Sequence, residues 1–344
     1  MYLGVSRLDI QFKMSQTNIQ GLRICRFFDG NFMVDNYGVL NVSRDDNVDY
    51  NTIFHACSIS KFITAICVLN LAAKNILNLD KDINKYLHTW KLMTKDNTDN
   101  RPTTLRELLS HCSGIIDALG SFNPYVHGET PVSNVDILRG MTRFHTGEVM
   151  VSGERKGCME YSDAGYCVIE QIIQDTTGHG TDFYTQEYII EPLGLKSTFF
   201  WQRGLENTYP LDKCAVGHDQ RGKQVDEIQA CYPNPSGAGL WSTTTELSII
   251  AYDTMQCFHG KGHILPQSQA MLLLSPHQNS RWNGLGVFLS PEKKQFFSQG
   301  WGVGMQSKLV GNIQESKGIV VMMNCDPGVD QAHSIIGEII EDFM

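Results

Sequence analysis

Cys57-Ser-Ile-Ser-Lys-Phe-Ile-Thr-Ala-Ile66 is the stretch of this sequence that decides the fold. Its apolar residues recur at helical spacing: Ile59, Phe62, Ile63 and Ile66. Residues 59–74 contain neither Gly nor Pro, so the pattern predicts a buried helix over this range. Ser58 and Lys61 then lie about one turn apart on the same face, at the amino-terminal end of the helix.

The Ser58–Lys61 pair is a candidate nucleophile with its base. A serine hydroxyl is a poor nucleophile until a base takes its proton. Lys61 serves as that base if burial among the apolar neighbours lowers its pKa. The N–H of Ser58, free at a helix start, can help to bind an oxyanion. The alternative is that Ser58 only caps the helix and that Lys61 extends into water.

A second candidate element is Tyr161-Ser-Asp163, which precedes a predicted helix over 164–177. A phenol beside an ammonium group can pass a proton between a serine and a leaving group. In the alternative interpretation Tyr161 is an ordinary half-buried aromatic residue and Asp163 caps the next helix.

The third element is the glycine-rich run Ser298-Gln-Gly-Trp-Gly-Val-Gly304, which leads into a strand-like segment over 305–310. Glycine allows a substrate to lie close against a strand edge. A backbone N–H of this strand is then available to complete an oxyanion hole. The alternative is a tight turn into a strand. No strand–helix unit surrounds the glycines, which argues against a dinucleotide site.

The remaining pattern places strands at both ends of the chain and helices in the middle. The predicted strands are 22–29, 32–42, 285–289, 305–310 and 319–323, with a hairpin turn at 29–31. The predicted helices include a short one that begins with a Thr104/Glu107 capping box and ends at Gly114, and others over 133–146, 164–177 and 331–343. We expect an α+β fold, in which one mostly antiparallel sheet is built from both termini. An α/β lobe over about 1–80 and 240–344 would then carry an inserted helical lobe over about 81–239.

Composition excludes several classes of function. The chain has 344 residues, 42% of them hydrophobic, and a net charge of −9, without the basic stripe that a nucleic-acid binder needs. The sequence contains no apolar stretch of 18 residues, so no membrane-spanning helix is predicted. No signal peptide is evident, and we therefore expect a cytoplasmic protein, although an exported form could have lost its signal. The ten cysteines form no C-x-x-C pair, and we expect buried thiols such as Cys67 and Cys167, no metal and no cofactor.

Together these motifs resemble the β-lactamase-related serine hydrolases, which include class C β-lactamases, low-molecular-weight penicillin-binding proteins, D-peptidases and certain esterases. The resemblance extends over most of the chain, through segments 52–61, 75–87, 104–115, 161–166, 191–198 and 237–246. It implies a β-lactamase/transpeptidase-like fold with a five-stranded antiparallel sheet flanked by helices. It also implies that Ser58 is acylated, that Lys61 is its base and that Tyr161 relays the proton.

The sequence departs from the family pattern at two places. The second motif usually ends in Asn, where this chain has Asp163; a carboxylate close to Lys61 would raise the pKa of the lysine. The third motif usually begins with a Lys or His that attracts a substrate carboxylate. Here Ser298-Gln299-Gly300 occupies that place, or Gln299 begins it if the motif shifts by one residue. The same spacing makes the Trp301 N–H the oxyanion donor. The other candidates for oxyanion or substrate binding are Asp163, Ser298, Gln299 and Gly300.

We therefore expect a hydrolase of small esters or of peptides ending in a D-residue, with weak β-lactam hydrolysis at most. The competing hypothesis is a binding or sensor module that becomes acylated but does not turn over, since the third motif lacks its cation. Oligomeric state is left open by the sequence.

Overall fold

The computed structural model describes residues 9–44, 46–95, 99, 101–155, 159–225, 229–277, 280–292 and 294–344. The amino-terminal residues 1–8, on which the expectation about a signal peptide depends, lie outside this description. Within the described ranges, no helix combines the length and the apolar character that a membrane crossing requires.

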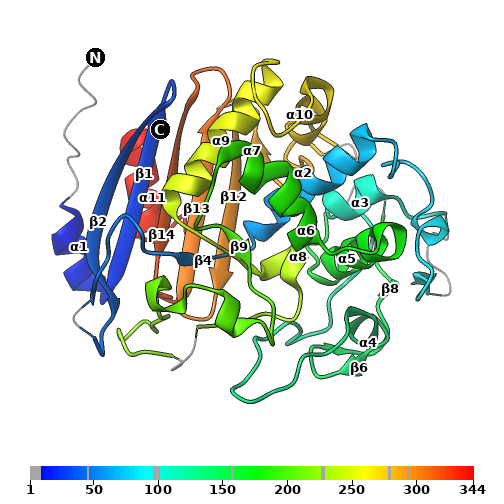
Figure 1. Ribbon diagram of the computed structural model, residues 1–344, viewed down its shortest axis with the longest axis horizontal. Coiled ribbons are helices and arrows are strands. Elements are labelled where there is room, and N and C mark those ends of the chain that lie inside the picture. Colours follow the sequence, from blue (N-terminus) through cyan, green and yellow to red (C-terminus); the bar gives the residue numbers. More distant parts are fainter. Residues whose placement is uncertain are drawn as a thin grey trace.

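A seven-stranded antiparallel sheet forms one side of the molecule (Figure 1). Its spatial order is β11 (Phe288–Ser290), β12 (Gln295–Gly302), β13 (Met305–Asn312), β14 (Lys317–Met323), β1 (Gly21–Phe28), β2 (Asn31–Asn41) and β3 (Asp46–Asn47). Strand β1 pairs with β14, so the two ends of the chain meet in one sheet, as predicted. Four of the five long strands, β1, β2, β13 and β14, were predicted as strands, whereas β12 was not and the predicted strand over 285–289 corresponds to the short β11.

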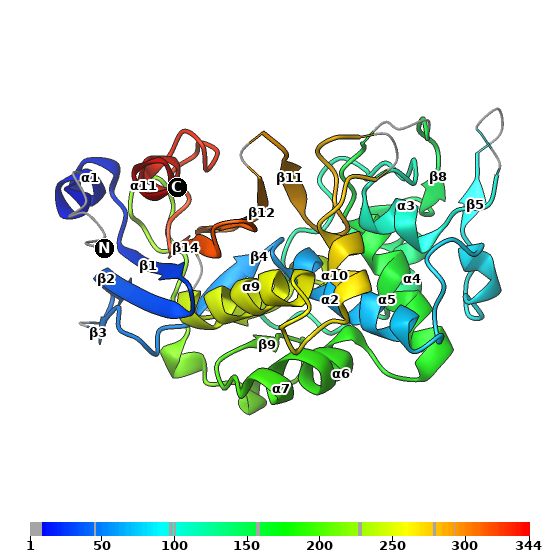
Figure 2. The same ribbon diagram turned by 90° about the horizontal axis from the view of Figure 1, so that it is seen from above.

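Helices cover both faces of this sheet, as Figure 2 shows. On one face lie α1 (Ile10–Thr17) and α11 (Ile335–Phe343), whose apolar side chains pack on β1 and β14. On the other lie α9 (Thr244–Phe258) and α2 (Ser60–Ala73), which belong to the larger core. Helices on both sides explain why β1 and β14 are almost continuously buried and do not alternate between buried and exposed residues.

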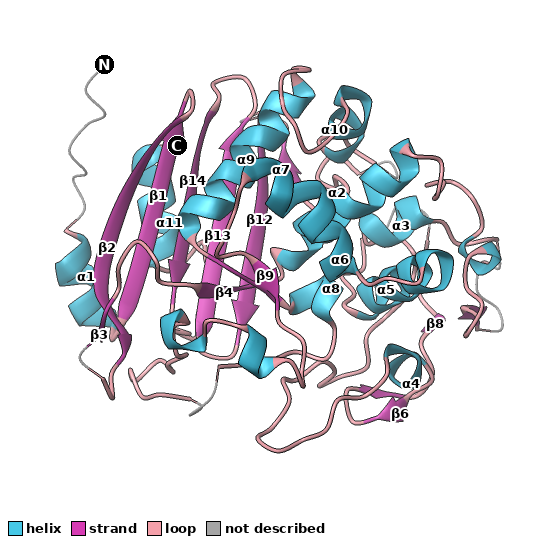
Figure 3. Cartoon of the chain, viewed as in Figure 1, coloured by secondary structure: helices cyan, strands magenta, loops and turns pink. Residues whose placement is uncertain are grey.

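The other side of the molecule is mainly helical (Figure 3). Its helices are α3 (Leu105–Leu109), α4 (Asn134–Leu138), α5 (Ala164–Thr177), α6 (Thr181–Thr185), α7 (Glu191–Leu193) and α8 (Pro235–Ala238), with α10 (Gln267–Leu273) beside α2 and α9. Short helical turns lie at Ile83–Lys85, Gln186–Ile190, Glu206–Thr208 and Leu211–Lys213. Short strand pairs join β5 (Met93–Thr94) to β8 (Met150–Val151) and β6 (Met141–Thr142) to β7 (His145–Thr146).

A small second sheet lies between the two sides. It consists of β4 (Phe54–Cys57), β10 (Leu240–Ser242) and β9 (Phe199–Phe200). Strand β4 leads directly into Ser58 and α2, and β10 joins α8 to α9. Strand β4 thus brings Ser58, the predicted nucleophile, to the boundary between the large sheet and the helical side.

Several sequence predictions are confirmed by the structure. The helix over 164–177 has the predicted bounds, and the 59–74 helix begins one residue later, at Ser60. Thr104 and Glu107 form the predicted capping box. Among the described residues, nine cysteines are buried and none of them forms a disulfide.

Other predictions were wrong. The range 133–146 is a five-residue helix followed by a small hairpin, because Gly140 takes a φ of 69° and ends the helical run. Helix α3 stops at Leu109 with Ser110 as its C-cap, so Gly114 (φ 75°) belongs to the following loop. The strand expected at 285–289 begins at Phe288, and the last helix starts at Ile335, four residues late.

Candidate active site

The turn between β4 and α2 positions Ser58. Cys57, the last residue of β4, takes a φ of 50°, a left-handed conformation that costs a non-glycine residue about 1–2 kcal/mol. Ser60 holds this turn in place: its Oγ donates to the Cys57 carbonyl (2.6 Å) and accepts from the Leu240 N–H (2.9 Å). The half-buried Ser58 therefore lies just before the first residue of α2, as the sequence predicted.

Lys61 is buried beside Ser58, with 3% of its side chain exposed. Its Nζ donates to Ser58 Oγ (3.1 Å), to Asp163 Oδ1 (2.6 Å) and to the Gly237 carbonyl (2.9 Å). A lysine ammonium has three donors, and all three have acceptors here. The alternative in which Lys61 extends into water is therefore wrong.

The protonation of Lys61 differs from the sequence expectation. Burial alone lowers the pKa of Lys61, but the Asp163 charge and the contacts with Asp163 and Tyr161 outweigh burial and raise it above its usual value. In the resting site Lys61 is thus an ammonium paired with Asp163. The expected lowering of its pKa is wrong because the carboxylate is in direct contact.

Tyr161 completes the cluster around Ser58. Its side chain is in hydrogen-bonding contact with both Lys61 and Ser58. Its ring stacks on His111 at a centroid distance of 4.3 Å and faces Phe288 at 6.5 Å, while 37% of the residue is exposed. Burial of the hydroxyl end raises the pKa of Tyr161, so the phenol is neutral at rest.

The loop that contains Asp163 is held by a residue that sequence reasoning missed. Asp117 accepts hydrogen bonds from Ser162 Oγ (2.6 Å) and from the N–H groups of Asp163 (2.7 Å) and Ala164 (3.1 Å). Asp117, and not the Asp163 side chain, therefore caps the start of α5. A single Asp in the run Ile-Ile-Asp-Ala-Leu gave no signal of this role.

Two further residues near Lys61 gave little signal in the sequence. Asn234 donates from Nδ2 to Asp163 Oδ1 (3.2 Å), and Gly237 offers its carbonyl to Lys61. A Cβ on Gly237 would lie 3.0 Å from Asp163 Oδ1, so glycine is required for this approach. His111 supports Tyr161 by stacking on its ring: burial lowers the pKa of His111 to about 3, and its Nδ1 accepts from the Ser162 N–H (3.2 Å).

The first five residues of the third candidate motif lie in β12, and only Val303 and Gly304 form the turn before β13. A Cβ on Gly300 would lie 2.3 Å from the Ala56 carbonyl oxygen and 2.7 Å from Cys57 Cβ, so β12 lies against the residues that precede Ser58. Alternation along the strand places the buried Ser298 on the same face as Gly300, with Gln299 and Trp301 on the opposite face. Trp301 is 46% exposed, opposite Gln306 of β13.

The alternation separates the two residues that could begin the third motif. Ser298 lies on the face toward β4, whereas Gln299 lies on the opposite face and is paired with Lys308 of β13. Serine brings no charge, and the ammonium of Lys61 is paired with Asp163. Within the described residues, no group of three or more His, Cys, Asp and Glu side chains is arranged to hold a metal ion.

The fold and the site together define the class of the protein. An antiparallel sheet covered by helices on both faces, with an S-x-x-K serine and lysine between the sheet and a helical side, is the arrangement of the serine hydrolase superfamily that includes penicillin-binding proteins and β-lactamases. The chain belongs to the Beta-lactamase family, whose model matches residues 9–339. The predicted resemblance is confirmed.

Comparisons with individual proteins agree with this membership. The chain is 24% identical over 328 residues to Protein flp of Staphylococcus aureus (strain MW2), covering 92% of this chain and 61% of the relative. It is 24% identical over 268 residues to the putative penicillin-binding protein PbpX of Bacillus subtilis (strain 168), covering 75% of this chain and 60% of the relative. The chain thus spans about three fifths of the length of these curated relatives.

Solved structures share the fold at low identity. The D-amino acid amidase from Ochrobactrum anthropi SV3, complexed with D-phenylalanine, aligns with a TM-score of 0.76 at 18% identity, over 97% of this chain and 95% of that one. The octameric penicillin-binding protein homologue from Pyrococcus abyssi aligns with a TM-score of 0.71 at 20% identity, over 92% of this chain and 72% of that one.

Proposed function

We propose that this protein is a serine hydrolase that forms an acyl-enzyme on Ser58, with Lys61 as the base and Tyr161 as the proton relay. The observation that supports this proposal best is the position of the buried Lys61 Nζ, 3.1 Å from Ser58 Oγ, with Tyr161 in hydrogen-bonding contact with both residues. A lysine with only a structural role would not require both a half-buried serine hydroxyl and a phenol as neighbours.

The chemistry proceeds in two steps. Lys61 first gives up one of its own protons, and Ser58 Oγ then attacks the carbonyl carbon of the substrate as the serine proton passes to the neutral amine. The N–H groups of Ser58 and Trp301 stabilise the oxyanion. The C–O or C–N bond to the leaving group then breaks, and Tyr161 delivers the proton to that group. In the second step water takes the place of the leaving group, its proton follows the reverse route, and Ser58 is released.

The substrates that fit best are small esters and peptides or amides of D-residues. In this proposal Ser298 takes the place of the cation of the third motif, so an uncharged hydroxyl, and not a Lys or His, meets a substrate carboxylate. The similarity of the fold to a D-amino acid amidase supports the choice of D-amides. β-Lactams, which usually present a carboxylate, are expected to be hydrolysed weakly at most.

Covalent labelling tests the proposal. Incubation with a fluorophosphonate should place one adduct on Ser58, detected by peptide mass spectrometry. Ser58→Ala should abolish the adduct and lower ester or D-amide turnover by orders of magnitude, because no other group replaces the nucleophile. Ser15→Ala, on the exposed surface of α1, is the matched control and should label normally. Absence of any Ser58 adduct would refute the proposal.

One observation favours a second candidate function, a sensor that is acylated but not turned over. Among the described residues, Lys61 is paired with Asp163 and Ser298 carries no charge, so neither supplies a free cation to the site. Stable labelling of Ser58 by a penicillin, together with no turnover of nitrophenyl esters or D-amino acid amides, would select this function. Rapid turnover of either substrate would exclude it.

A further inference from the structure

Ser58, Lys61 and Asp163 form a continuous hydrogen-bonded chain. Ser58 Oγ lies 3.1 Å from Lys61 Nζ, which lies 2.6 Å from Asp163 Oδ1. A chain of this kind can move two protons together, one from the serine to the amine and one from the amine to the carboxylate. An Asn in place of Asp163 could donate to and accept from the lysine, but it could not store its proton.

The surroundings hold Asp163 in this place. Asp117 fixes the backbone N–H of Asp163 (2.7 Å), and Asn234 donates to the same Oδ1 that faces Lys61 (3.2 Å). The Asp163 side chain is 25% exposed, whereas Lys61 is 3% exposed. The carboxylate is thus rigidly aimed at the amine and closer to solvent than the amine is.

We propose that Asp163 is the terminal proton acceptor for the nucleophile: a Lys61 proton moves to Asp163 Oδ1, and the neutral amine so formed takes the proton of Ser58 Oγ as that oxygen attacks. This inference rests on the proposed function of Ser58. It assigns to Asp163 a role that acts through Lys61, in place of the contact with substrate that the sequence suggested. The proton returns along the same chain when the leaving group departs or when water attacks, so no proton is lost.

The other titratable groups that face Lys61 or Asp163 are poor candidates for this role. Burial lowers the pKa of His111 to about 3, and its Nδ1 is already occupied by the Ser162 N–H. Burial raises the pKa values of Tyr161 and Tyr166, on the α5 side, and of the Cys57 thiol on β4. Burial also raises the pKa of Asp117, but its oxygens accept from Ser162, Asp163 and Ala164.

The proposal has a consequence for the dependence of acylation on pH. The Lys61–Asp163 pair holds its proton internally, so activation of Ser58 requires no proton release to solvent. We therefore expect the rate of Ser58 acylation to be nearly constant between about pH 6 and pH 9. Without the carboxylate, Lys61 must first lose a proton to water, and the rate should rise with pH by about tenfold per unit until the amine is neutral.

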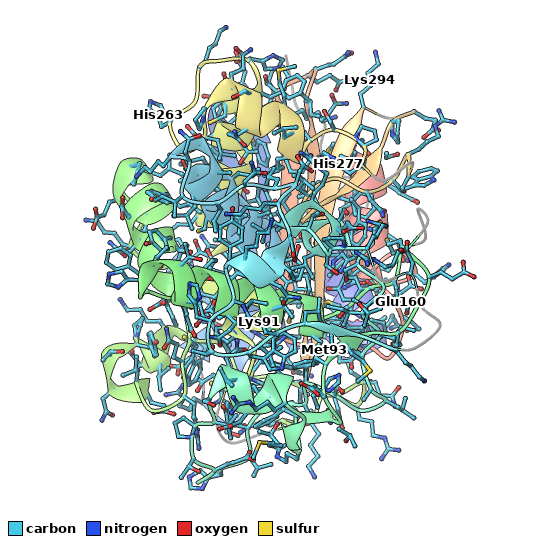
Figure 4. The ribbon with its side chains drawn as sticks, turned by 90° about the vertical axis from the view of Figure 1, so that its right-hand side faces the viewer. Lys91, Met93, Glu160, His263, His277 and Lys294 are labelled. Carbon is cyan, nitrogen blue, oxygen red and sulfur yellow. The ribbon has the colours of Figure 1, made fainter. Side chains whose placement is uncertain are left out.

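The test is the second-order rate of Ser58 labelling by a fluorophosphonate, measured from pH 6 to pH 9 for the wild type and Asp163→Asn. In this reaction the Oγ–P bond forms, the P–F bond breaks, fluoride leaves and the serine proton stays on the pair. No physiological substrate is needed. Glu160→Gln is the matched control, since Glu160, labelled in Figure 4, is an exposed carboxylate three residues away.

We expect the labelling rate of the wild type divided by that of Asp163→Asn to fall by at least about tenfold from pH 6 to pH 9. The labelling rate of the wild type divided by that of Glu160→Gln should stay constant over the same range. A ratio for Asp163→Asn that does not change with pH would overturn the proposal. A wild-type rate that itself rises tenfold per pH unit would overturn it as well, even if the variant failed to fold. Loss of Ser58 labelling in the wild type would instead refute the proposed function.

Discussion

Tyr161 has two roles that reside in different parts of one side chain. Its ring lies against His111 and Phe288, and so it contributes to packing, while its hydroxyl contacts Ser58 and Lys61. The Lys61 Nζ lies 4.9 Å from the centroid of the same ring, which adds a favourable cation–π contact. The ring and the hydroxyl can therefore be tested separately.

Replacement of Tyr161 by Phe should leave the ring contacts and remove the relay. We expect kcat for ester or D-amide hydrolysis to fall by about 10²–10⁴-fold, the usual contribution of a positioned acid or base. The thermal midpoint should change little, because the hydroxyl is the only group lost. Steady-state kinetics and a melting curve measure both effects; full activity in Tyr161→Phe would show that the hydroxyl transfers no proton.

At the scale of the elements, β12 and β4 approach so closely that only glycine fits between them. A Cβ on Gly300 would meet the Ala56 carbonyl oxygen, and one on Gly302 would meet Cys57 Sγ at 2.9 Å. The strained turn at Cys57 is enclosed by these contacts and by Ser60. The position of Ser58 thus depends on a strand almost 250 residues further along the chain.

Gly300→Ala should therefore disturb both stability and activity. The added methyl group has no room, and overpacking of this kind costs about 1–3 kcal/mol. We expect a lower free energy of unfolding in urea and a reduced rate of Ser58 labelling. Gly165→Ala is the matched control: its Cβ would lie 3.6 Å from the nearest atom, Ser162 Oγ, in an ordinary helix of α5. Equal effects of the two substitutions would contradict this account.

The helices and strands around the site show which parts of the fold could be predicted from sequence patterns and which could not. The bounds of helix α5 were predicted correctly because its apolar residues recur at helical spacing over the whole range between Asp163 and Gly178. Gly178, with a φ of 78°, ends the helix. Strand β12 was not predicted as a strand because its three site residues, Gly300, Trp301 and Gly302, lack the β-branched pattern of a strand. Their conformation is set by pairing with β13 and by contact with β4.

For the whole molecule, burial of neutral histidines links the free energy of unfolding to pH. Burial lowers the pKa of His111 to about 3 and that of His55 to about 4. His55 lies between the rings of Tyr232 and Trp241, at centroid distances of 5.1 and 5.0 Å. The unfolded chain protonates each histidine near its ordinary pKa of about 6.5, whereas the folded protein does not. Their contribution to stability is therefore present above about pH 6.5 and is lost as pH falls.

The substitution His111→Asn should reduce the dependence of the unfolding free energy on pH. Asn keeps an acceptor near the Ser162 N–H and tolerates the φ of 57° at this position. We expect the slope of unfolding free energy against pH, between about pH 4 and pH 6, to fall by about 1.4 kcal/mol per pH unit. Urea denaturation at several pH values measures the slope, with His127→Asn on an exposed loop as the control. An unchanged slope would mean that His111 is already protonated in the folded protein.

The sequence alone determined the α+β class, the helix that presents Ser58 and Lys61, the tyrosine motif and the family, because these depend on local spacing along continuous stretches of chain. Only the tertiary structure decided the charge state of Lys61, the capping of α5 by Asp117 and the place of Ser298 in β12. Each of these depends on contacts between residues far apart in sequence, and the energy of such contacts is set by distance and burial in the folded protein.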